Sequence, residues 1–233
     1  MFINGESEMK IILMFVFFIP SIFAQEYKAL NLKGDVYYQP GTAEEWIKLK
    51  EGTIINADAF VSTGKNSSVK LVGKDESVML KELSAISVGS IKKMSTDELL
   101  LALAMENMIN APKTNGKSPS NTTATYGEKE DEKVINVGEN DFGIKRLNGA
   151  TELASSGLKE SAIIFANETY RKYPDTKKIA KYRILFADIF YEKGLYTEAL
   201  GEYLEIKKLK LTNEESKKVN ASVEKLNNIL LTE

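Results

Sequence analysis

The chain of 233 residues contains neither cysteine nor histidine. The lack of cysteine excludes a disulfide framework and a cysteine-linked lipoprotein anchor. The lack of both residues excludes Cys/His zinc sites and nucleophiles that are activated by histidine. The formal net charge of −2 gives no general attraction to nucleic acid or to an anionic membrane. The apolar fraction of 43% is close to the globular average, so most of the chain is expected to fold.

Residues 11–24 form a nearly continuous apolar run that follows Lys10. Its 14 residues are too few for a membrane span, which needs about 20, but they match the apolar core of a secretory signal peptide. We therefore predict a signal peptide over 1–24 that is cleaved near Ala24, with translation starting at Met1 or Met9. The mature protein is then periplasmic or secreted, with no membrane span. An uncleaved anchor is the alternative.

Residues 25–112 are predicted to form a small all-β module followed by a helix. Short runs of β-branched and aromatic residues alternate with turn residues, which is typical of a sandwich or barrel. The predicted strands lie near 36–38, 46–49, 53–55, 59–61, 68–72, 77–80 and 85–88. Ser95 and Glu98 have the spacing of a capping box, which predicts a helix over 96–110. That helix is apolar on more than one face, so we expect it to pack on the β module or on a partner.

Residues 113–141 are dominated by Asn, Ser, Thr, Gly, Lys and Glu. Such a stretch cannot bury enough apolar surface to offset the entropy of ordering, which predicts a disordered linker. The flanking segments carry net charges of only −2 and +3, too little to argue that they dock.

Residues 142–233 are predicted to form an all-α domain, so the chain as a whole is α+β in two domains. Stop and start signals at Gly157, Pro174, Gly194 and Thr212 separate five amphipathic segments. The predicted helices lie near 142–156, 158–172, 177–193, 196–210 and 213–231.

An internal repeat is visible in this segment, because Gly-Leu followed by Ala recurs 37 residues apart, at Gly157 and Gly194. The pattern resembles the tetratricopeptide repeat. The matching residues are Gly157, Ala162 and Pro174 in the first copy, and Phe186, Ala187, Phe190, Gly194, Ala199 and Tyr203 in the second. The resemblance implies helical hairpins with a concave protein-binding face. On that face we expect the partner-binding residues Lys181, Arg183, Asp188 and Tyr191. An ordinary helical bundle is the alternative.

Residues 29–90 resemble the FecR domain, a β-rich extracytoplasmic module. The resemblance rests on the order of several short motifs. They are Leu32 to Val36, Trp46, Gly52, Asp58 to Gly64, Ser67 to Leu71 and Asp75 to Val78. The family includes periplasmic sensors that regulate sigma factors, but this chain shows no cytoplasmic segment before the domain. What the resemblance implies is therefore a binding or structural module.

We identify no catalytic, cofactor-binding or metal-binding residues. The Ser-x-x-Lys matches at Ser67 and Ser90 lack the companion motifs of a penicillin-recognising fold. The lysine clusters are interleaved with glutamate on amphipathic helices, which indicates solvated faces and no nucleic-acid partner. We therefore expect an exported, non-enzymatic adaptor that binds protein partners. The alternatives are a membrane-attached FecR-type regulator, a carbohydrate-binding envelope protein, or an enzyme that uses carboxylates alone.

Overall fold

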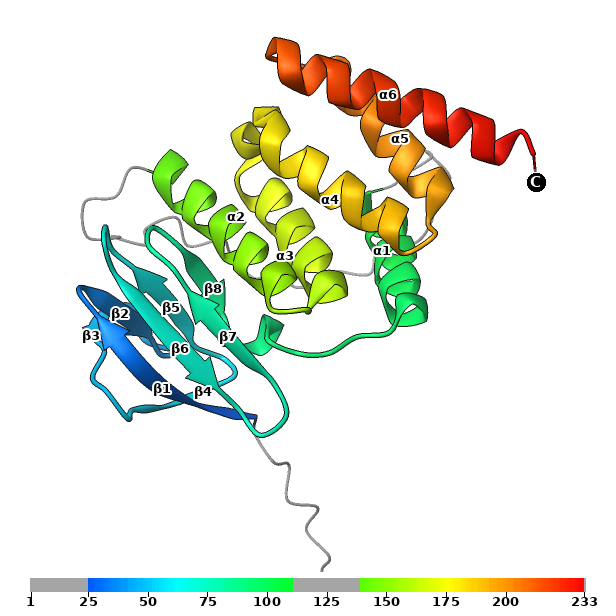
Figure 1. Cartoon of the computed structure of the whole chain (residues 1–233). Coiled ribbons are helices and arrows are strands. Elements are labelled where there is room, and N and C mark those ends of the chain that lie inside the picture. The colour runs from blue at the N-terminus through cyan, green and yellow to red at the C-terminus, as the bar shows by residue number, and fades with distance from the viewer. Residues whose placement is uncertain (1–24, 111–138, 233) are drawn as a thin grey trace, which may run out of the picture.

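The computed structural model describes residues 25–110 and 139–232, and it places a β module before a helical region (Figure 1). The predicted α+β class is confirmed. The strands are β1 (Glu26–Lys33), β2 (Val36–Gln39), β3 (Ile47–Lys48), β4 (Ile54–Asn56), β5 (Phe60–Thr63), β6 (Ser68–Val72), β7 (Ser77–Leu80) and β8 (Ala85–Ser87). The predicted signal peptide, 1–24, lies outside the described residues, as does most of the predicted linker.

The β module consists of two antiparallel sheets, with strand orders β4-β1-β6-β7 and β3-β2-β5-β8. Alternation explains the strands: in β6 the side chains of Val69 and Leu71 are fully buried, whereas Lys70 between them is half-buried. β1, for which we predicted no strand, is central in its sheet and buries Tyr27 and Ala29. Alanine and lysine have low strand propensity, so pairing on both sides stabilises β1 more than its own composition does.

The helical region begins with η1 and α1 and continues, after residue 138, with two hairpins and a final helix. The elements are η1 (Val88–Ser90), α1 (Thr96–Asn110), α2 (Glu139–Ser155), α3 (Lys159–Lys172), η2 (Pro174–Lys178), α4 (Ala180–Glu192), α5 (Tyr196–Ile206) and α6 (Asn213–Leu230). The capping box predicted at Ser95 is present, since the Glu98 amide donates to Ser95 Oγ and the Ser95 amide donates to the Glu98 carboxylate. α2 begins at Glu139, so the last three residues of the predicted linker are helical.

The first hairpin (α2 and α3) and the second hairpin (α4 and α5) turn in the same way. Gly157 and Gly194 adopt φ values of +87° and +74°, which a glycine tolerates without strain. The amide of Leu158 donates to the Leu153 carbonyl at 3.0 Å, and that of Leu195 donates to the Phe190 carbonyl at 2.9 Å. Both turns are therefore Schellman caps, and the helix stops predicted at Gly157 and Gly194 are confirmed.

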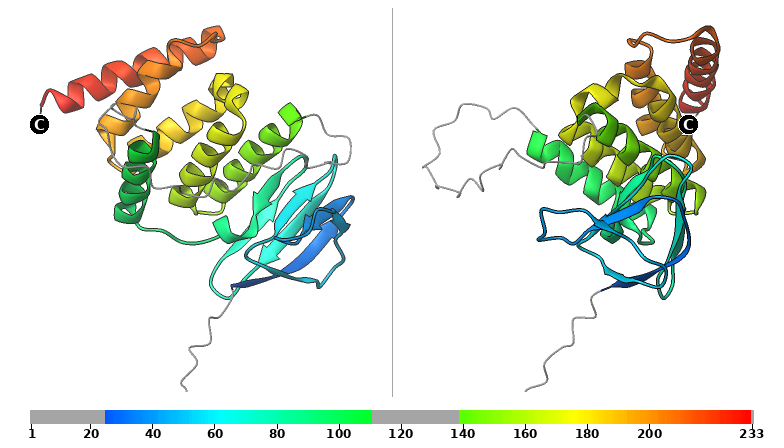
Figure 2. Two further views of the ribbon diagram at one scale, coloured as in Figure 1. Left: turned by 180° about the vertical axis from the view of Figure 1, so that it is seen from behind. Right: turned by 90° about the vertical axis from the view of Figure 1, so that its left-hand side faces the viewer.

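The β module packs directly on α2, and this contact was not predicted. Gly149 lies against β8 so closely that a Cβ atom there would be 2.0 Å from the Ala85 carbonyl oxygen. The Asn148 amide donates to the Leu83 carbonyl at 2.7 Å, and Lys145 Nζ donates to the Thr63 carbonyl at 3.1 Å. The two regions share one continuous buried core. The β module and α6 therefore lie at opposite ends of the helical hairpins (Figures 1 and 2).

Arg146 of α2 lies where the β module and both helices of the first hairpin meet. Its side chain is only 1% exposed, and its guanidinium lies over the rings of Phe60 in β5 and Phe165 in α3, 5.1 and 4.4 Å from their centroids. Its Nε donates to Thr169 Oγ1 at 3.1 Å, and it forms an ion pair with Glu168. The cation–π contacts, the hydrogen bond to Thr169 and the ion pair with Glu168 together offset the cost of burying this cation.

Candidate protein-binding surfaces

The four residues predicted to bind partners all lie on α4, and Arg183 is the most buried of them. It is 7% exposed, and its guanidinium donates two hydrogen bonds to the Glu202 carboxylate of α5, from Nε at 2.5 Å and Nη2 at 2.8 Å. Bidentate pairs of this kind fix geometry strongly. Arg183 therefore joins the two helices of its hairpin and holds Glu202 in place.

Asp188 and Tyr191 face the last helices of the chain. The Asp188 carboxylate accepts a hydrogen bond from the Tyr203 hydroxyl and forms an ion pair with Lys218 of α6 at 2.5 Å. Tyr191 packs on Tyr196, with ring centroids 5.5 Å apart, and the Lys225 ammonium of α6 lies 4.4 Å from its ring centroid. These contacts join α4 to α5 and α6.

Lys181 is exposed at the start of α4, with its ammonium group 4.5 Å from the centroid of the Tyr182 ring. The structure thus brings Asp188 and Tyr191 together with α6, places Arg183 between α4 and α5, and leaves Lys181 on the surface. Partner binding by these four residues stays a prediction.

A groove that Phe186 and Phe190 of α4 help to line, on the helix face that also carries Arg183, was not predicted from the sequence. It has a volume of about 720 Å³ and is named here the α1–α5 groove after its two walls. Its lining residues are Leu100, Leu103 and Ala104 of α1, Ile163 and Asn167 of α3, Phe186 and Phe190 of α4, and Glu198, Gly201, Glu202 and Glu205 of α5. The floor is aromatic and aliphatic, and the α5 wall is acidic. A possible signal in the sequence was the i, i+4, i+7 spacing of the three glutamates.

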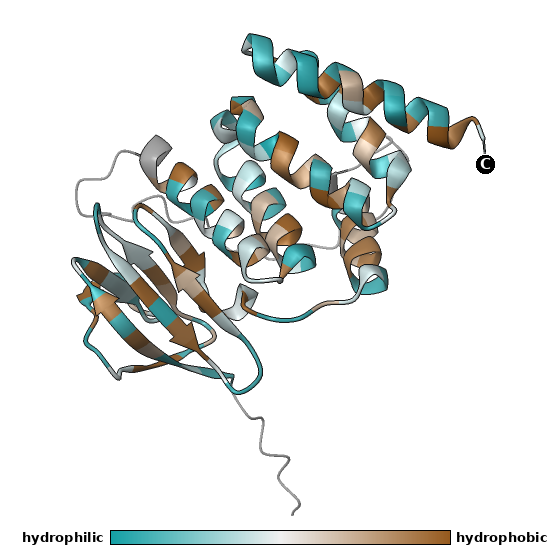
Figure 3. Cartoon of the chain, viewed as in Figure 1, coloured by the Kyte–Doolittle hydropathy of each residue, from teal (hydrophilic) through white to brown (hydrophobic). Residues whose placement is uncertain are grey.

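α1 forms the other wall because it packs on α3 rather than on the sheets. Leu99 is fully buried, which anchors the start of the helix. Leu101, Met105 and Met108 are 63%, 56% and 78% exposed, so α1 keeps an apolar face in solvent. In Figure 3 much of α1 is coloured as hydrophobic, whereas hydrophilic and hydrophobic residues alternate along α6. Exposed apolar patches of this kind commonly mark interaction sites.

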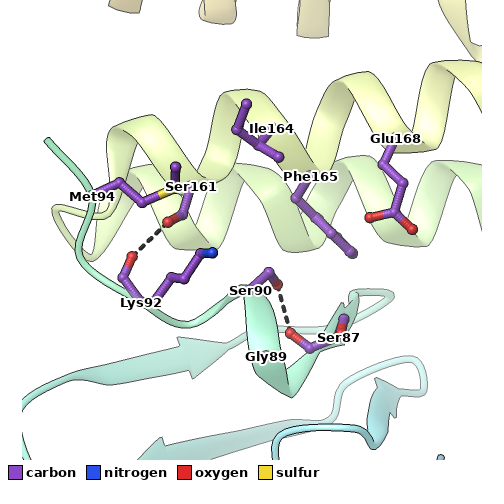
Figure 4. Close-up of a pocket in the computed structure, with 9 residues that line it drawn as sticks. All are labelled: Ser87, Gly89, Ser90, Lys92, Met94, Ser161, Ile164, Phe165 and Glu168. Atoms are coloured by element: carbon purple, nitrogen blue, oxygen red, sulfur yellow. Dashed lines mark hydrogen bonds between the residues drawn. The ribbon is translucent and has the colours of Figure 1, made fainter. Parts of the chain in front are cut away.

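A smaller cavity of about 210 Å³ lies between η1 and α3 (Figure 4). Two of its three serine hydroxyls bond within the chain: Ser90 Oγ donates to the Ser87 carbonyl and Ser161 Oγ to the Lys92 carbonyl, each at 2.5 Å. Glu168, which also lines it, is the ion-pair partner of Arg146. This cavity therefore belongs to the junction between the β module and the first hairpin.

The strongest pKa shifts fall on buried tyrosines. Burial raises the pKa of Tyr27 to about 12, with a further contribution from Glu76 and Asp75. Burial also raises the pKa of Tyr170 and of Tyr203, the latter with help from its hydrogen bond to Asp188. Hydrogen bonds lower the pKa of the Glu98, Asp175 and Glu205 carboxyls. A general acid or base works best with a pKa near the operating pH, and all these shifts lead away from neutrality.

Among residues 25–110 and 139–232, no group of three or more acidic side chains is placed to hold a metal ion. No helix within the same ranges has the length and apolar character needed to cross a membrane. Comparison with protein families, with curated proteins and with solved structures gives no match to this chain.

Proposed function

We propose that the chain is an exported, non-enzymatic scaffold that binds protein partners in the bacterial envelope. The observation that carries this proposal is the α1–α5 groove, which combines an apolar floor with an acidic wall beside the exposed apolar face of α1. Protein interfaces of this kind pair a desolvated apolar centre with a polar rim.

Two resemblances support the same function. The repeated hairpins, with their equivalent caps at Gly157 and Gly194, are consistent with tetratricopeptide-like helices, a family that presents surfaces to protein partners. The two-sheet module is consistent with a FecR-like domain, for which a binding or structural role is the implication.

The packing of the β module on α2 bears on how a partner would be bound. With Gly149 against β8 and Arg146 between Phe60 and Phe165, the two regions form one packed unit. A linker that lets two independent modules engage separate partners is therefore not needed. In the proposed mechanism, a partner binds reversibly to a surface whose helices are already held in place, which lowers the entropic cost of binding.

Cross-linking in cells, followed by mass spectrometry, tests this function. A photo-reactive residue in place of Met105, which is exposed on α1, should give reproducible cross-links to one or a few envelope proteins. The same residue in place of Asn220, which is exposed on α6, serves as the matched control. Absence of protein cross-links from both positions would contradict the scaffold function. Amino-terminal sequencing tests export separately, and a mature chain that begins at Gln25 is expected.

A further inference from the structure

The floor of the α1–α5 groove is apolar and is built from two helices, α3 and α4. Ile163, Phe186 and Phe190 form its base, while Leu100 and Leu103 of α1 stand half-buried at its side. A volume of about 720 Å³ is enough for several apolar side chains but not for a folded domain. The groove therefore suits side chains that project from one face of a segment.

The walls of the groove carry negative charge and no positive side chain among the described lining residues. Glu198, Glu202 and Glu205 lie along one face of α5 at helical spacing. Glu202 is matched by Arg183 and Glu205 by Lys208, whereas Glu198 has no ion-pair partner in the described part of the chain. On the α1 side, Glu106 accepts a hydrogen bond from Asn167 at 3.3 Å. Glu198 is thus the one acidic side chain among the described lining residues that has no ion-pair partner.

Gly201 lines the groove and adds no side chain to it. A Cβ atom there would have no other atom within 4 Å, so the space above this turn of α5 is free. Glycine is unfavourable in the interior of a helix, and no close contact requires it at this position. Ala104 on the facing wall is also small.

The exposed face of α1 extends this surface. Leu101, Met105 and Met108 follow one another at helical spacing, next to the α1 residues that line the groove. Methionine side chains adapt to irregular apolar surfaces and are common where a groove receives helices of varied sequence.

Resting on the proposed function, we propose that the α1–α5 groove binds a basic amphipathic helix of a partner protein. Apolar side chains spaced along one face would enter between α1 and α5, in the helix-in-groove mode. Lysine or arginine residues flanking that face would meet Glu198 and the outer edges of Glu202 and Glu205. The acidic wall then selects against acidic helices, because like charges in a desolvated groove repel.

Synthetic helices and a groove-filling variant test this proposal. The probes are an amphipathic peptide of leucine and lysine and its counterpart of leucine and glutamate, each labelled for fluorescence anisotropy with the full chain. We expect the lysine peptide to bind at least about tenfold more tightly than the glutamate peptide, and its affinity to fall as salt is added.

Gly201→Phe fills the groove with a residue that favours helix more than glycine does, so the fold is expected to be kept and can be checked by circular dichroism. We expect it to weaken binding of the lysine peptide at least about tenfold, as loss of a central anchor pocket does. The matched control, Asn220→Phe on the exposed face of α6, should leave binding unchanged. Glu198→Lys should weaken the lysine peptide and strengthen the glutamate peptide.

Four outcomes would overturn the proposal: equal binding of both peptides, unchanged binding by Gly201→Phe, concentration-dependent dimers that Gly201→Phe abolishes, or binding to phospholipid vesicles that Gly201→Phe abolishes. The dimers would assign the groove to a second copy, and the vesicles would assign it to lipid. If cellular cross-links persist in Gly201→Phe, the scaffold function stands while this site assignment fails. If the peptides bind as expected but no cellular cross-links form, the scaffold function fails while the assignment of the groove as a site for basic helices stands.

Discussion

The two helical hairpins share their local design but differ in what covers them. Both turn through a left-handed glycine, and both bury an arginine at the same repeat position, Arg146 and Arg183, 37 residues apart. The first hairpin lies against the β module through α2, whereas the second packs on α6, mainly through α5.

The difference is clearest at Gly149 and its counterpart in the second hairpin, Phe186. Glycine leaves room for the Ala85 carbonyl of β8, while phenylalanine fills the floor of the α1–α5 groove. This repeat position thus faces a sheet in the first hairpin and the α1–α5 groove in the second. The turn residues determine where each hairpin forms, and the residue at this repeat position helps to determine what packs against it.

The largest effect is expected from Gly149→Ala, which places a methyl group where the Ala85 carbonyl oxygen lies. We expect the free energy of unfolding to fall by about 3 kcal/mol, because the helix and the sheet must move apart. Gly201→Ala is the matched control, since its Cβ meets open space and alanine favours helix, so stability should rise by about 1 kcal/mol. Urea unfolding measures both. Equal effects of the two substitutions would remove the proposed difference between the hairpins.

Replacing each buried arginine by methionine sharpens the comparison. Arg146→Met loses two aromatic contacts, a hydrogen bond and an ion pair across three elements, so we expect a loss of about 2 kcal/mol. Arg183→Met loses its pairing with Glu202 within one hairpin and no aromatic stacking contact among the described residues, so we expect about 1 kcal/mol. Thermal or urea unfolding of both variants checks the order, and a greater loss at Arg183 would contradict it.

Alkaline titration probes the β module and the hairpins separately. Because folding raises the pKa of Tyr27 from 10.0 to about 12, the folded chain keeps a proton that the unfolded chain has lost. The contribution of this raised pKa to the free energy of unfolding is therefore fully present below pH 10 and is lost as the pH rises towards 12. Tyr27→Phe also loses the hydrogen bond to the Ile91 carbonyl, so it should be about 1 kcal/mol less stable at neutral pH.

Tyr27→Phe should also show a shallower alkaline decline in stability than the unchanged chain, because the titration of Tyr27 is removed. Part of the decline should remain, because folding also raises the pKa of Tyr170 and Tyr203 in the hairpins. Unfolding followed as a function of pH gives both quantities. An identical alkaline slope in the two proteins would show that the β-module tyrosine contributes nothing to it.

The smallest effect is expected in the polar chain that joins the β module to both hairpins. Asn148 donates to the Leu83 carbonyl and accepts from the Tyr182 hydroxyl at 2.6 Å. A double-mutant cycle with Asn148→Ala and Tyr182→Phe should give a coupling energy of about 0.5 kcal/mol. A value of zero would mean that the hydrogen bond between α2 and α4 adds nothing to their packing.

Features with local causes were predictable from the sequence. The capping box at Ser95 and the helix stop and start signals at Gly157, Gly194 and Thr212 depend on residues within about one helical turn, and the structure confirms them. β1 was missed because its stability comes from two neighbouring strands. The contact of α2 with β8 was missed because it depends on the absence of a side chain at Gly149. The sequence pattern does not indicate which distant segment approaches that glycine. The groove was missed for a related reason, since four helices from distant parts of the chain form it.

The single tryptophan allows a direct test that the β module and the hairpins form one packed unit. Trp46 lies in the β module with its ring edge-on to Phe142 of α2, the centroids 5.9 Å apart, so its fluorescence reports on the module and on the contact. Far-ultraviolet circular dichroism of the same sample reports mainly on the helices. If the two regions unfold together, both signals should give one coincident transition in urea. Two separated transitions, with the helices unchanged when the tryptophan signal is lost, would contradict the account.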